Sequence, residues 1–431
     1  MRSRLYISAL ILFIPACVFG QLNWTEHVIS DSFHGAWYAV LVDIDNDNDF
    51  DIHGSAYDAN CISWWENNGN QGFVEHTICT GFTGPKRVCA VDLDGDTDLD
   101  IAGAGFLCDT LAWWENDGNE NFIARHIIVA NWGQPNYVCA VDLNEDNEMD
   151  LLVTSCQAGK AVWFENIGNQ AFTEHIIKTN WQGATHLCPV DLDQDNDIDV
   201  IGAGPGSGQI LWFENDGSQS FTEHILSAGW GAPNSIAAED IDQDGDIDFA
   251  ATSCFGQIAW FENTGSQAFT RHTIVSNLNQ ARSVRVADLN ADGYSDIVAV
   301  TRQTNAVRWY ENDGSQNYTQ RSIAENFMGA NHVCIEDIDD DSDPDILGAA
   351  LNADQVVWWE NSPTAIDEGK RMPIDFDNAI PTIINGPLPV TGGDYKIFDI
   401  AGRQITSLSP KPGIYFIEIQ GGYSHKIIKV K

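Results

Sequence analysis

An acidic loop of nine residues recurs seven times along this chain, at intervals of 48 to 50 residues. An aspartate, or a residue that replaces it, stands at nearly every second position of each copy. The copies begin at Asp43, Asp92, Asp142, Asp191, Asp240, Asp288 and Asp337. A period of this length indicates stacked copies of one supersecondary unit, because a single unit of that size cannot bury its apolar face. The repeat therefore determines the architecture before any single residue needs a functional role.

Two other motifs recur with the loop, and each occurs seven times. One is a Trp-aromatic-Glu-Asn cluster, which begins at Trp64, Trp113, Trp163, Trp212, Trp260, Trp309 and Trp358. The other is an aromatic residue followed by a short polar segment and an apolar pair, and it begins at Trp24, Phe73, Phe122, Phe172, Phe221, Phe269 and Tyr318. Most copies of this second motif contain a histidine, at His27, His76, His126, His175, His224 and His272. Because these histidines share one register, we expect them to pack or to form hydrogen bonds within the blades and not to catalyse a reaction.

Within each repeat, short apolar or alternating segments rich in Val, Ile, Phe and Trp are separated by Gly, Asn, Asp or Ser, which is typical of strands joined by turns. In the repeat after Asn136 we expect strands at residues 137–141, 151–155, 161–165 and 172–177. Four antiparallel strands per repeat form one blade of a propeller. The sequence thus predicts an all-β fold, a seven-bladed β-propeller of four-stranded blades over residues 21–361.

The order of the motifs predicts how the ring closes. The first motif in the chain is a fourth strand, at residues 24–29, whereas the last repeat stops at Asn361 without one. We therefore expect the N-terminal strand to complete the last blade. Such closure joins the two ends of the array and protects a sheet edge that would otherwise promote aggregation.

The acidic loops have the composition of a cation site. The chain carries a net charge of −42, and the loops supply roughly half of its 63 acidic groups, so nucleic acid is excluded as a partner. Calcium takes six to eight oxygen ligands, which a short loop supplies from alternate residues. Five carboxylates within nine residues repel one another unless a cation neutralises them. The alternative is an exposed acidic turn without an ion.

We predict up to seven Ca²⁺ ions, one per loop. The predicted ligands are Asp43, Asp45, Asp47, Asp49 and Asp51; Asp92, Asp94, Asp96, Asp98 and Asp100; Asp142, Asn144, Asp146, Glu148 and Asp150; Asp191, Asp193, Asp195, Asp197 and Asp199; Asp240, Asp242, Asp244, Asp246 and Asp248; Asp288, Asn290, Asp292 and Asp296; and Asp337, Asp339, Asp341, Asp343 and Asp345. The sixth loop has Tyr294 at its seventh position, which is compatible with a site if that position binds through its carbonyl. An EF-hand is excluded because position twelve is never Glu and the flanking segments are strands.

The loop between the first two strands, as in residues 240–248, followed by an apolar strand, resembles the FG-GAP or VCBS repeat of calcium-binding propellers, related in architecture to integrin alpha-chain heads. The resemblance spans the seven repeats. It implies the fold and the metal, whereas that family serves adhesion, ligand binding and sometimes catalysis.

The N-terminal segment predicts export. Arg2 and Arg4 precede an apolar run over residues 5–18, which reads as a secretory signal peptide over residues 1–20 with cleavage after Gly20. Cleavage before Cys17 with lipid attachment is the alternative. No later apolar run reaches the roughly 18 residues of a membrane helix. Nine cysteines remain after Cys17 is removed. Four of them, in first strands, are expected to be buried, and disulfides among the other five are left open.

After residue 361 the repeats end. Residues 362–387, with four prolines, predict a linker, and residues 388–431 a small β-sandwich-like domain with strands at 395–400, 413–419 and 426–431. These strands and the intervening Ala401-Gly402-Arg403 turn resemble the C-terminal sorting domain of type IX secretion cargo, although Gly386 interrupts the usual Asn-Pro entry. The resemblance implies the type IX secretion machinery as a partner and a secreted or outer-surface-attached protein. An ordinary accessory module is the alternative.

Function is expected on the face opposite the acidic loops, because that face varies among copies. The residue five before each loop predicts a ring at its centre: Tyr38, Arg87, Tyr137, His186, Ser235, Ser283 and His332. Such a ring suits a sugar or peptide ligand, or it is a solvated rim. We expect a non-catalytic binding or adhesion module for a surface protein or glycan. A calcium-supported polysaccharide lyase or hydrolase acting on the same face, or a mere spacer, are the alternatives.

Overall fold

The computed structural model describes residues 22–69, 72–265, 268–278 and 280–363, together with five strands nearer the C-terminus. The chain divides into two compact units, residues 1–364 and 365–431. The predicted signal peptide and most of the predicted linker lie outside the described residues. Within the described part, no helix is both long and apolar enough to span a bilayer.

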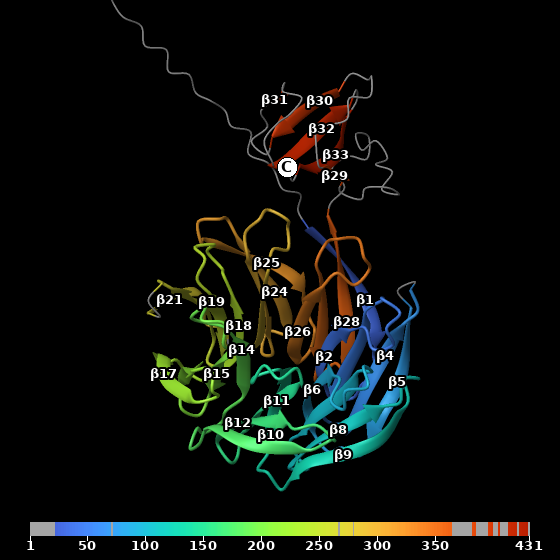
Figure 1. The fold of residues 1–431 in the computed structure, drawn as a ribbon, viewed down its shortest axis with the longest axis vertical. Coiled ribbons are helices and arrows are strands. Elements are labelled where there is room, and N and C mark those ends of the chain that lie inside the picture. Colours follow the sequence, from blue (N-terminus) through green and yellow to red (C-terminus); the bar gives the residue numbers. More distant parts are fainter. Residues whose placement is uncertain are drawn as a thin grey trace, which may run out of the picture. The chain divides into compact units, whose positions relative to one another are not determined.

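The first unit is a ring of seven four-stranded antiparallel sheets (Figure 1), as the repeat predicted. The first strands are β2 (Ala36–Val42), β6 (Pro85–Val91), β10 (Pro135–Val141), β14 (His186–Val190), β18 (Pro233–Glu239), β22 (Ala281–Ala287) and β26 (Ala330–Glu336). The second strands are β3 (Asp51–Ala56), β7 (Asp100–Gly105), β11 (Asp150–Ser155), β15 (Asp199–Gly204), β19 (Asp248–Ser253), β23 (Asp296–Thr301) and β27 (Asp345–Ala350). Each acidic loop therefore connects the first strand of a blade to the second.

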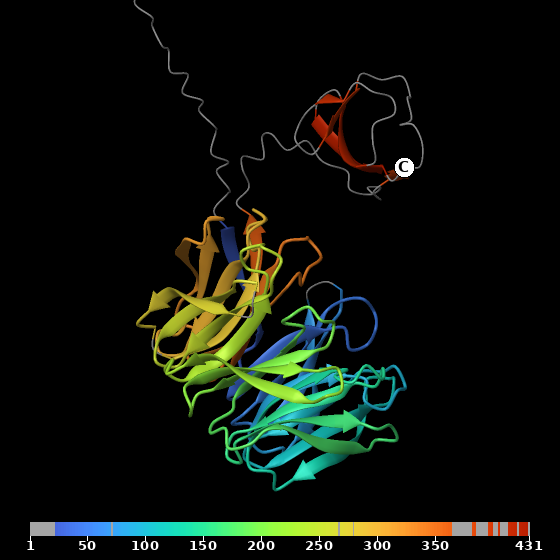
Figure 2. The same cartoon turned by 60° about the vertical axis from the view of Figure 1, so that its left-hand side comes forward.

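The outer half of each blade contains the two aromatic motifs. The third strands are β4 (Cys61–Asn67), β8 (Thr110–Asn116), β12 (Lys160–Asn166), β16 (Gln209–Asn215), β20 (Gln257–Asn263), β24 (Ala306–Asn312) and β28 (Gln355–Pro363). The fourth strands are β5 (Phe73–Thr80), β9 (Phe122–Ala130), β13 (Phe172–Lys178), β17 (Phe221–Ala228), β21 (Phe269–Ser276), β25 (Tyr318–Ala324) and β1 (Leu22–Ser30). Figure 2 shows the same blades from a second direction.

The N-terminal strand closes the ring. Strand β1 pairs antiparallel with β28, with Trp24 opposite Asn361 and His27 opposite Trp358. The two strands lie side by side in Figure 1 although they come from opposite ends of the propeller sequence. The closure predicted from the order of the motifs is confirmed.

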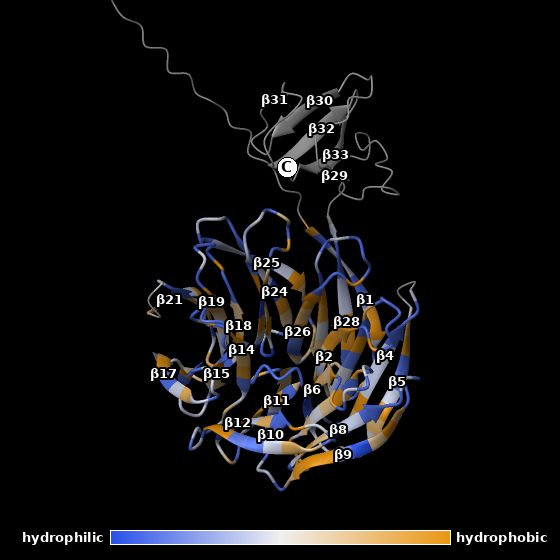
Figure 3. Cartoon of the chain, viewed as in Figure 1, coloured by the Kyte–Doolittle hydropathy of each residue, from blue (hydrophilic) through white to orange (hydrophobic). Residues whose placement is uncertain are grey.

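The core lies between neighbouring blades. All six residues of every second strand are buried, whereas the fourth strands have exposed residues along their length. Small residues such as Gly202 fit here because a Cβ at that position would come within 2.5 Å of the Trp181 ring. Figure 3 shows apolar segments concentrated in the strands and polar residues in the loops. Burying one large apolar side chain contributes about 1.5–3 kcal/mol, so each inter-blade cluster stabilises the ring substantially.

The second unit contains one five-stranded sheet in the order β29-β33-β32-β30-β31. Its strands are β29 (Thr382–Ile384), β30 (Tyr395–Asp399), β31 (Gln404–Ile405), β32 (Gly413–Ile419) and β33 (Gly422–Lys429). Strand β29 pairs parallel with β33, and the other pairs are antiparallel. Strands β30 and β32 lie where the sequence predicted them. The identity of this unit as a sorting domain stays a prediction.

Candidate metal loops and central cavity

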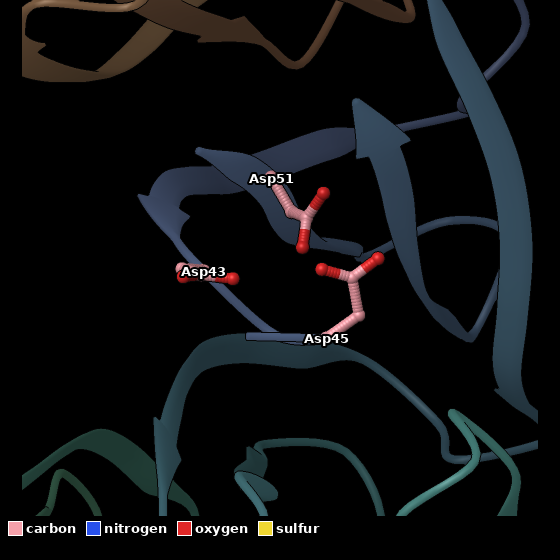
Figure 4. A group of neighbouring side chains, drawn as sticks. All are labelled: Asp43, Asp45 and Asp51. Carbon is pink, nitrogen blue, oxygen red and sulfur yellow. The ribbon is translucent and has the colours of Figure 1, made fainter. Parts of the chain in front are cut away.

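The acidic loops bring carboxylates from both ends of the loop together. In the first blade, oxygens of Asp43, Asp45 and Asp51 all lie within 4.8 Å of one another (Figure 4), and the loops that begin at Asp191, Asp240 and Asp337 group the same three positions. The loop that begins at Asp92 instead groups its first, third and fifth positions. These five clusters could hold metal ions, and they are the five loops in which the predicted carboxylate set is complete.

The ninth aspartate anchors each loop to the blade. Asp51 is fully buried, and its carboxylate accepts hydrogen bonds from the backbone N–H of Ile44 at 2.9 Å and of Asn67 at 2.8 Å. The same pair of bonds occurs in all seven blades. A carboxylate has four lone-pair directions, so two N–H donors leave capacity for a cation.

The first aspartate shapes the turn that brings the other ligands inward. Asp43 Oδ1 accepts from the N–H of Asp47 at 3.1 Å, and its Oδ2 accepts from the N–H of Asn48 at 3.0 Å. Asn46 and Asn48 have φ values of 60° and 77°, in the left-handed region that Asn and Gly adopt most easily. The fourth and sixth positions of the other loops are also left-handed, so these turns fold back on the first carboxylate as well; in the second loop Gly95 replaces the fifth residue as a donor to it.

The fifth position is absent from four of the five carboxylate clusters found among the described residues, the ninth from the Asp92 cluster, and the seventh from all five. In the first blade, Asp49 lies beside the turn between the third and fourth strands, where a Cβ on Gly69 would come within 2.8 Å of its Oδ2. In the fourth blade, Asp197 lies in the same way beside Gly217. No seventh-position side chain belongs to the five carboxylate clusters found among the described residues. Side-chain coordination by the following predicted ligands outside these clusters stays a prediction: Asp47, Asp195, Asp244 and Asp341 at the fifth position, Asp100 at the ninth, and Asp49, Asp98, Glu148, Asp197, Asp246 and Asp343 at the seventh.

The loops that begin at Asp142 and Asp288 do not form a three-carboxylate cluster within the described residues. In both of them the third position is an asparagine, Asn144 or Asn290, whose amide donates to the fifth aspartate at 3.0 and 3.1 Å, respectively. The ninth aspartates Asp150 and Asp296 keep both backbone hydrogen bonds. These two loops thus have the same fold but one fewer carboxylate at the centre.

Burial makes the loops electrostatically unfavourable without a cation. It raises the pKa of the ninth aspartate to about 6 in Asp199 and to about 7 in the other six copies, and the two backbone hydrogen bonds only partly oppose this increase. Burial, followed by repulsion from Asp96, also raises the pKa of Asp94. The buried Oδ1 of Asp94 has no hydrogen-bond partner. A bound cation would offset each of these costs.

The asparagine of each Trp-aromatic-Glu-Asn cluster supports the loop, a role that the sequence analysis did not assign. Besides donating its backbone N–H to Asp51, Asn67 donates its side-chain amide to the carbonyl of Phe50 at 3.2 Å and accepts from the N–H of Gly69. Its counterparts in the other blades also bond the ninth aspartate. The presence of Asn in every copy was the available signal.

The recurrent histidines pair within the blades, as predicted. His224 Nε2 lies 2.6 Å from Glu214, and its ring stacks on Trp212 with the centroids 4.4 Å apart. The other five histidines of the motif make the same pair of contacts. In the blade without the histidine, Arg321 donates to Glu311 at 2.7 and 2.8 Å. All of these side chains are therefore committed to structure.

The cysteines form no disulfides in the described part of the chain. Nine cysteines in the described part of the chain are free thiols. Cys89, Cys139, Cys188 and Cys334 are partly buried against the inter-blade clusters, as their register predicted. The disulfides left open among the remaining five are not formed.

The predicted ring comes together on the face opposite the acidic loops. Its seven residues line a single cavity of about 150 Å³ at the ends of the first strands. Arg87 lies between two aromatic rings, 4.6 Å from the centroid of Tyr38 and 4.1 Å from that of Tyr137. His332 Nε2 lies 2.8 Å from Arg285, which lines a second pocket that shares Arg87, Tyr137 and His186 with the cavity. The structure thus unites all the residues that the sequence placed in this ring.

A second set of lining residues was missed. In six blades the first strand contains a β-bulge just before or at the ring position. A bulge redirects a side chain that strict alternation would point away. The residue preceding each ring member also lines the cavity, beside a bulge in six blades and directly before the first strand in the fourth: Trp37, Lys86, Asn136, Thr185, Asn234, Arg282 and Asn331.

Comparison with known families agrees with this geometry. The FG-GAP-like repeat matches residues 43–103, 142–201, 191–251, 240–299 and 288–348, so that every matched segment begins at the first aspartate of a loop. Together the segments span more than half of the chain. The chain belongs to the FG-GAP-like repeat family. No curated protein matches its sequence significantly.

Solved structures resemble this FG-GAP-like propeller in fold. One is an Agrocybe aegerita lectin that recognises non-reducing terminal N-acetylglucosamine, with 18% identity and a TM-score of 0.50 over 68% of this chain and 81% of the lectin. A second is an inactive virginiamycin B lyase from Staphylococcus aureus with quinupristin, with 12% identity and a TM-score of 0.55 over 79% and 99%. A third is BBS1N in complex with ARL6DN, with 10% identity and a TM-score of 0.58 over 79% and 98%. At these identities the likeness shows the propeller fold alone.

Proposed function

We propose that this FG-GAP-like propeller is an exported, calcium-stabilised module that binds a surface protein or glycan on the face opposite its acidic loops, without catalysing a reaction. The observation that carries the proposal is the cavity, to which all seven blades contribute the predicted ring residue. Aromatic, basic and hydroxyl groups around one concave site are typical of ligand recognition. The lectin with the same fold supports a glycan ligand by analogy.

Calcium is the proposed ion because the loops offer only hard oxygen donors. The first, third and ninth carboxylates converge in four loops, and a backbone carbonyl at the seventh position would add a further ligand. Calcium accepts such irregular, carboxylate-rich sets, whereas magnesium requires near-octahedral geometry and retains several waters. The ion would neutralise the loop and cross-link its two ends, so its contribution is to stability.

Export and surface delivery are proposed from the chain ends. The signal-like segment over residues 1–20 and the resemblance of residues 388–431 to a type IX sorting domain both favour delivery outside the cell. Secretion of the full chain by a cell with that machinery, compared with a chain truncated after residue 361, tests this part. Retention of the truncated chain inside the cell is the expected result, and its equal secretion would contradict it.

Binding to a glycan array and to surface extracts, with the full chain in calcium, tests the proposed module. The variant Ser283→Phe fills the cavity from a residue whose hydroxyl has no hydrogen-bond partner, so we expect it to abolish binding and to leave the fold intact. Ser276→Phe, on the exposed outer strand β21, is the matched control. Unsaturated products or new reducing ends from a polysaccharide panel would instead establish the lyase or hydrolase alternative.

A further inference from the structure

The charge around the cavity is opposite to that of the chain. The sequence has a net charge of −42 and only 21 lysines and arginines. Yet Lys86, Arg87 and Arg282 all line the cavity, and its lining contains no aspartate or glutamate. Arg302, directly after β23, adds a fourth cation beside it, 5.3 Å from the centroid of Trp37. The cations come from two blades, with Lys86 and Arg87 on one and Arg282 and Arg302 on the other.

These cations have no carboxylate partners among the described residues. The ion pairs of lysine and arginine there involve other residues, namely Lys160, Lys178, Arg308 and Arg321. Neutral groups hold the cavity cations instead. Lys86 Nζ donates to Asn136 Oδ1 at 2.6 Å and lies 3.3 Å from the centroid of Phe106. Arg302 donates to Asn331. The positive charge is therefore positioned but not neutralised.

The electrostatic cost of this arrangement is visible at Lys86. Burial, together with repulsion from Arg282 and Arg302, lowers the pKa of Lys86 to about 7. Burial and repulsion from Arg282 also lower the pKa of Arg302 to about 10. Charges that repel one another in a buried position are stabilised by an anion placed between them. An anionic group in the cavity would supply that stabilisation.

Polar atoms with unused hydrogen-bonding capacity surround the same space. The Nε atoms of Arg87 and Arg282, Nδ1 of His186 and Oγ of Ser283 are buried without a hydrogen-bond partner. His186 is only 8% exposed and Ser283 only 3% exposed. Burial and the nearby Arg87 hold the pKa of His186 well below its usual value, so its ring is neutral. Unsatisfied buried donors and acceptors of this kind are costly unless a ligand or water completes them.

An aromatic surface lies beside the cations. Trp37 lines the cavity, and its ring contacts Tyr57 with the centroids 5.2 Å apart. Lys86 lies between Trp37 and Phe106, 4.9 Å and 3.3 Å from the respective centroids. An aromatic face next to hydroxyl and imidazole groups suits the apolar face and hydroxyls of a sugar ring. The cavity volume of about 150 Å³ admits one terminal unit and not a folded segment.

We propose that the cavity binds the terminal hexuronate of an acidic glycan, with its carboxylate between Lys86 and Arg282 and its ring against Trp37. This inference rests on the proposed function and assigns a chemical class to the ligand. Ser283 and His186 complete the site by exchanging hydrogen bonds with the sugar hydroxyls. The carboxylate of a peptide shares the anionic chemistry but lacks the sugar hydroxyls, whereas a sulfated sugar shares both and is distinguished from a hexuronate by its measured affinity.

Titration calorimetry of the full chain in calcium tests the assignment. Oligosaccharides that end in galacturonate or glucuronate are compared with galactose- and glucose-terminated ones of the same length. We expect the acidic sugars to bind at least tenfold more tightly and to lose affinity as salt rises. The preference should disappear in Lys86→Met and Arg282→Met, and Arg282→Lys should recover part of it. Lys178→Met, on the outer strand β13, should leave it unchanged.

The outcomes separate this inference from the proposed function. Equal affinity for acidic and neutral sugars, abolished by Ser283→Phe, would overturn the hexuronate assignment and leave the binding module in place. Tighter binding of sulfated sugars or of acidic peptides would overturn the assignment in the same way. If Ser283→Phe leaves the binding of all these ligand classes unchanged, the cavity is not the binding site. Melting curves of each variant in calcium confirm that its fold is retained.

Discussion

The two faces of this propeller use the same strands in opposite ways. On the acidic face, backbone N–H groups of the turn donate to Asp43 and its counterparts, and two N–H groups of the blade donate to Asp51 and its counterparts; the second loop differs only in that Gly95 replaces the fifth residue as a donor to the first aspartate. On the opposite face, the seven equivalent ring positions carry four different residue types, and several buried polar atoms have no hydrogen-bond partner among the described residues. Groups repeated in every blade stabilise the blade. Groups that differ among blades are free to recognise a ligand.

The faces also differ in what would complete them. The acidic loops satisfy their own backbone donors and lack only positive charge, which a simple ion supplies. The cavity has positive charge in place and lacks an anion together with hydrogen-bond partners for Arg87, His186 and Ser283. The acidic loops therefore suit a small cation, and the cavity suits an anionic ligand that also forms hydrogen bonds.

The largest expected effect is that of removing the cation from the acidic face. A ligand that binds only the folded state adds about 4 kcal/mol per site at a thousand times its Kd. With up to seven sites, excess EDTA should therefore lower the melting temperature by more than about 10 °C. Differential scanning calorimetry measures the shift. Calcium should restore the melting temperature and magnesium should restore it less, whereas a curve unchanged by EDTA would contradict a stabilising ion.

The sequence was sufficient to predict the repeated features of the propeller. Period, alternation and motif order predicted seven blades, their strands and their closure by β1, because each feature is repeated and local. The sequence also showed Asn67 and its counterparts in every copy. Their role was missed because it depends on a contact across about sixteen residues, between the third strand and Asp51.

The residues that line the cavity on the opposite face were predicted only in part, for a geometric reason. The ring residues were found because they share a register. Their neighbours Trp37, Lys86 and Arg282 were missed because alternation points adjacent side chains to opposite sides, and a β-bulge breaks that rule. Alternation also predicted Asp49 as a ligand; the structure places it after the left-handed residue Asn48 and beside Gly69, and its coordination stays a prediction.

The second prediction separates the ninth and seventh positions of one loop. Asp51→Asn removes a charge and turns an amide N–H₂ group toward the N–H donors of Ile44 or Asn67, so we expect a loss of about 2–4 kcal/mol in calcium. Asp49→Asn is the matched control and should change stability by less than about 0.5 kcal/mol. Chemical denaturation measures both, and native mass spectrometry should count one ion fewer in Asp51→Asn alone. Equal losses would show that side-chain charge at both positions is required.

The third prediction is that the affinity of the cavity for an acidic sugar depends on pH. The pKa of Lys86 is lowered from 10.5 to about 7, first by burial and then by Arg282 and Arg302, with Cys156 opposing the decrease. Above pH 7 the free protein has lost the proton of Lys86, and an anionic ligand must restore it. Affinity for an acidic sugar should therefore fall as pH rises above 7, by up to about tenfold per unit.

The stability of the ligand-free protein should change with pH in the opposite direction to the affinity. Because the unfolded chain keeps the proton of Lys86 up to about pH 10.5 and the folded chain loses it near pH 7, stability should rise with pH between these values. Calorimetry across pH 6 to 9 measures the affinity, with Lys86→Met as the control that should lack the slope. A slope that persists in Lys86→Met would assign the titration to another group.

The smallest expected effect is that of a repeated side chain far from the cavity. His224→Ala removes a partly exposed pair with Glu214 and a stacking contact with Trp212, so we expect a loss of about 1 kcal/mol. Ligand affinity should not change, because the contacts of His224 lie within its own blade. Denaturation and calorimetry on the same sample test both statements. A change in affinity without a change in stability would mean that repetition does not mark structural residues, and the contrast between the two faces would fail.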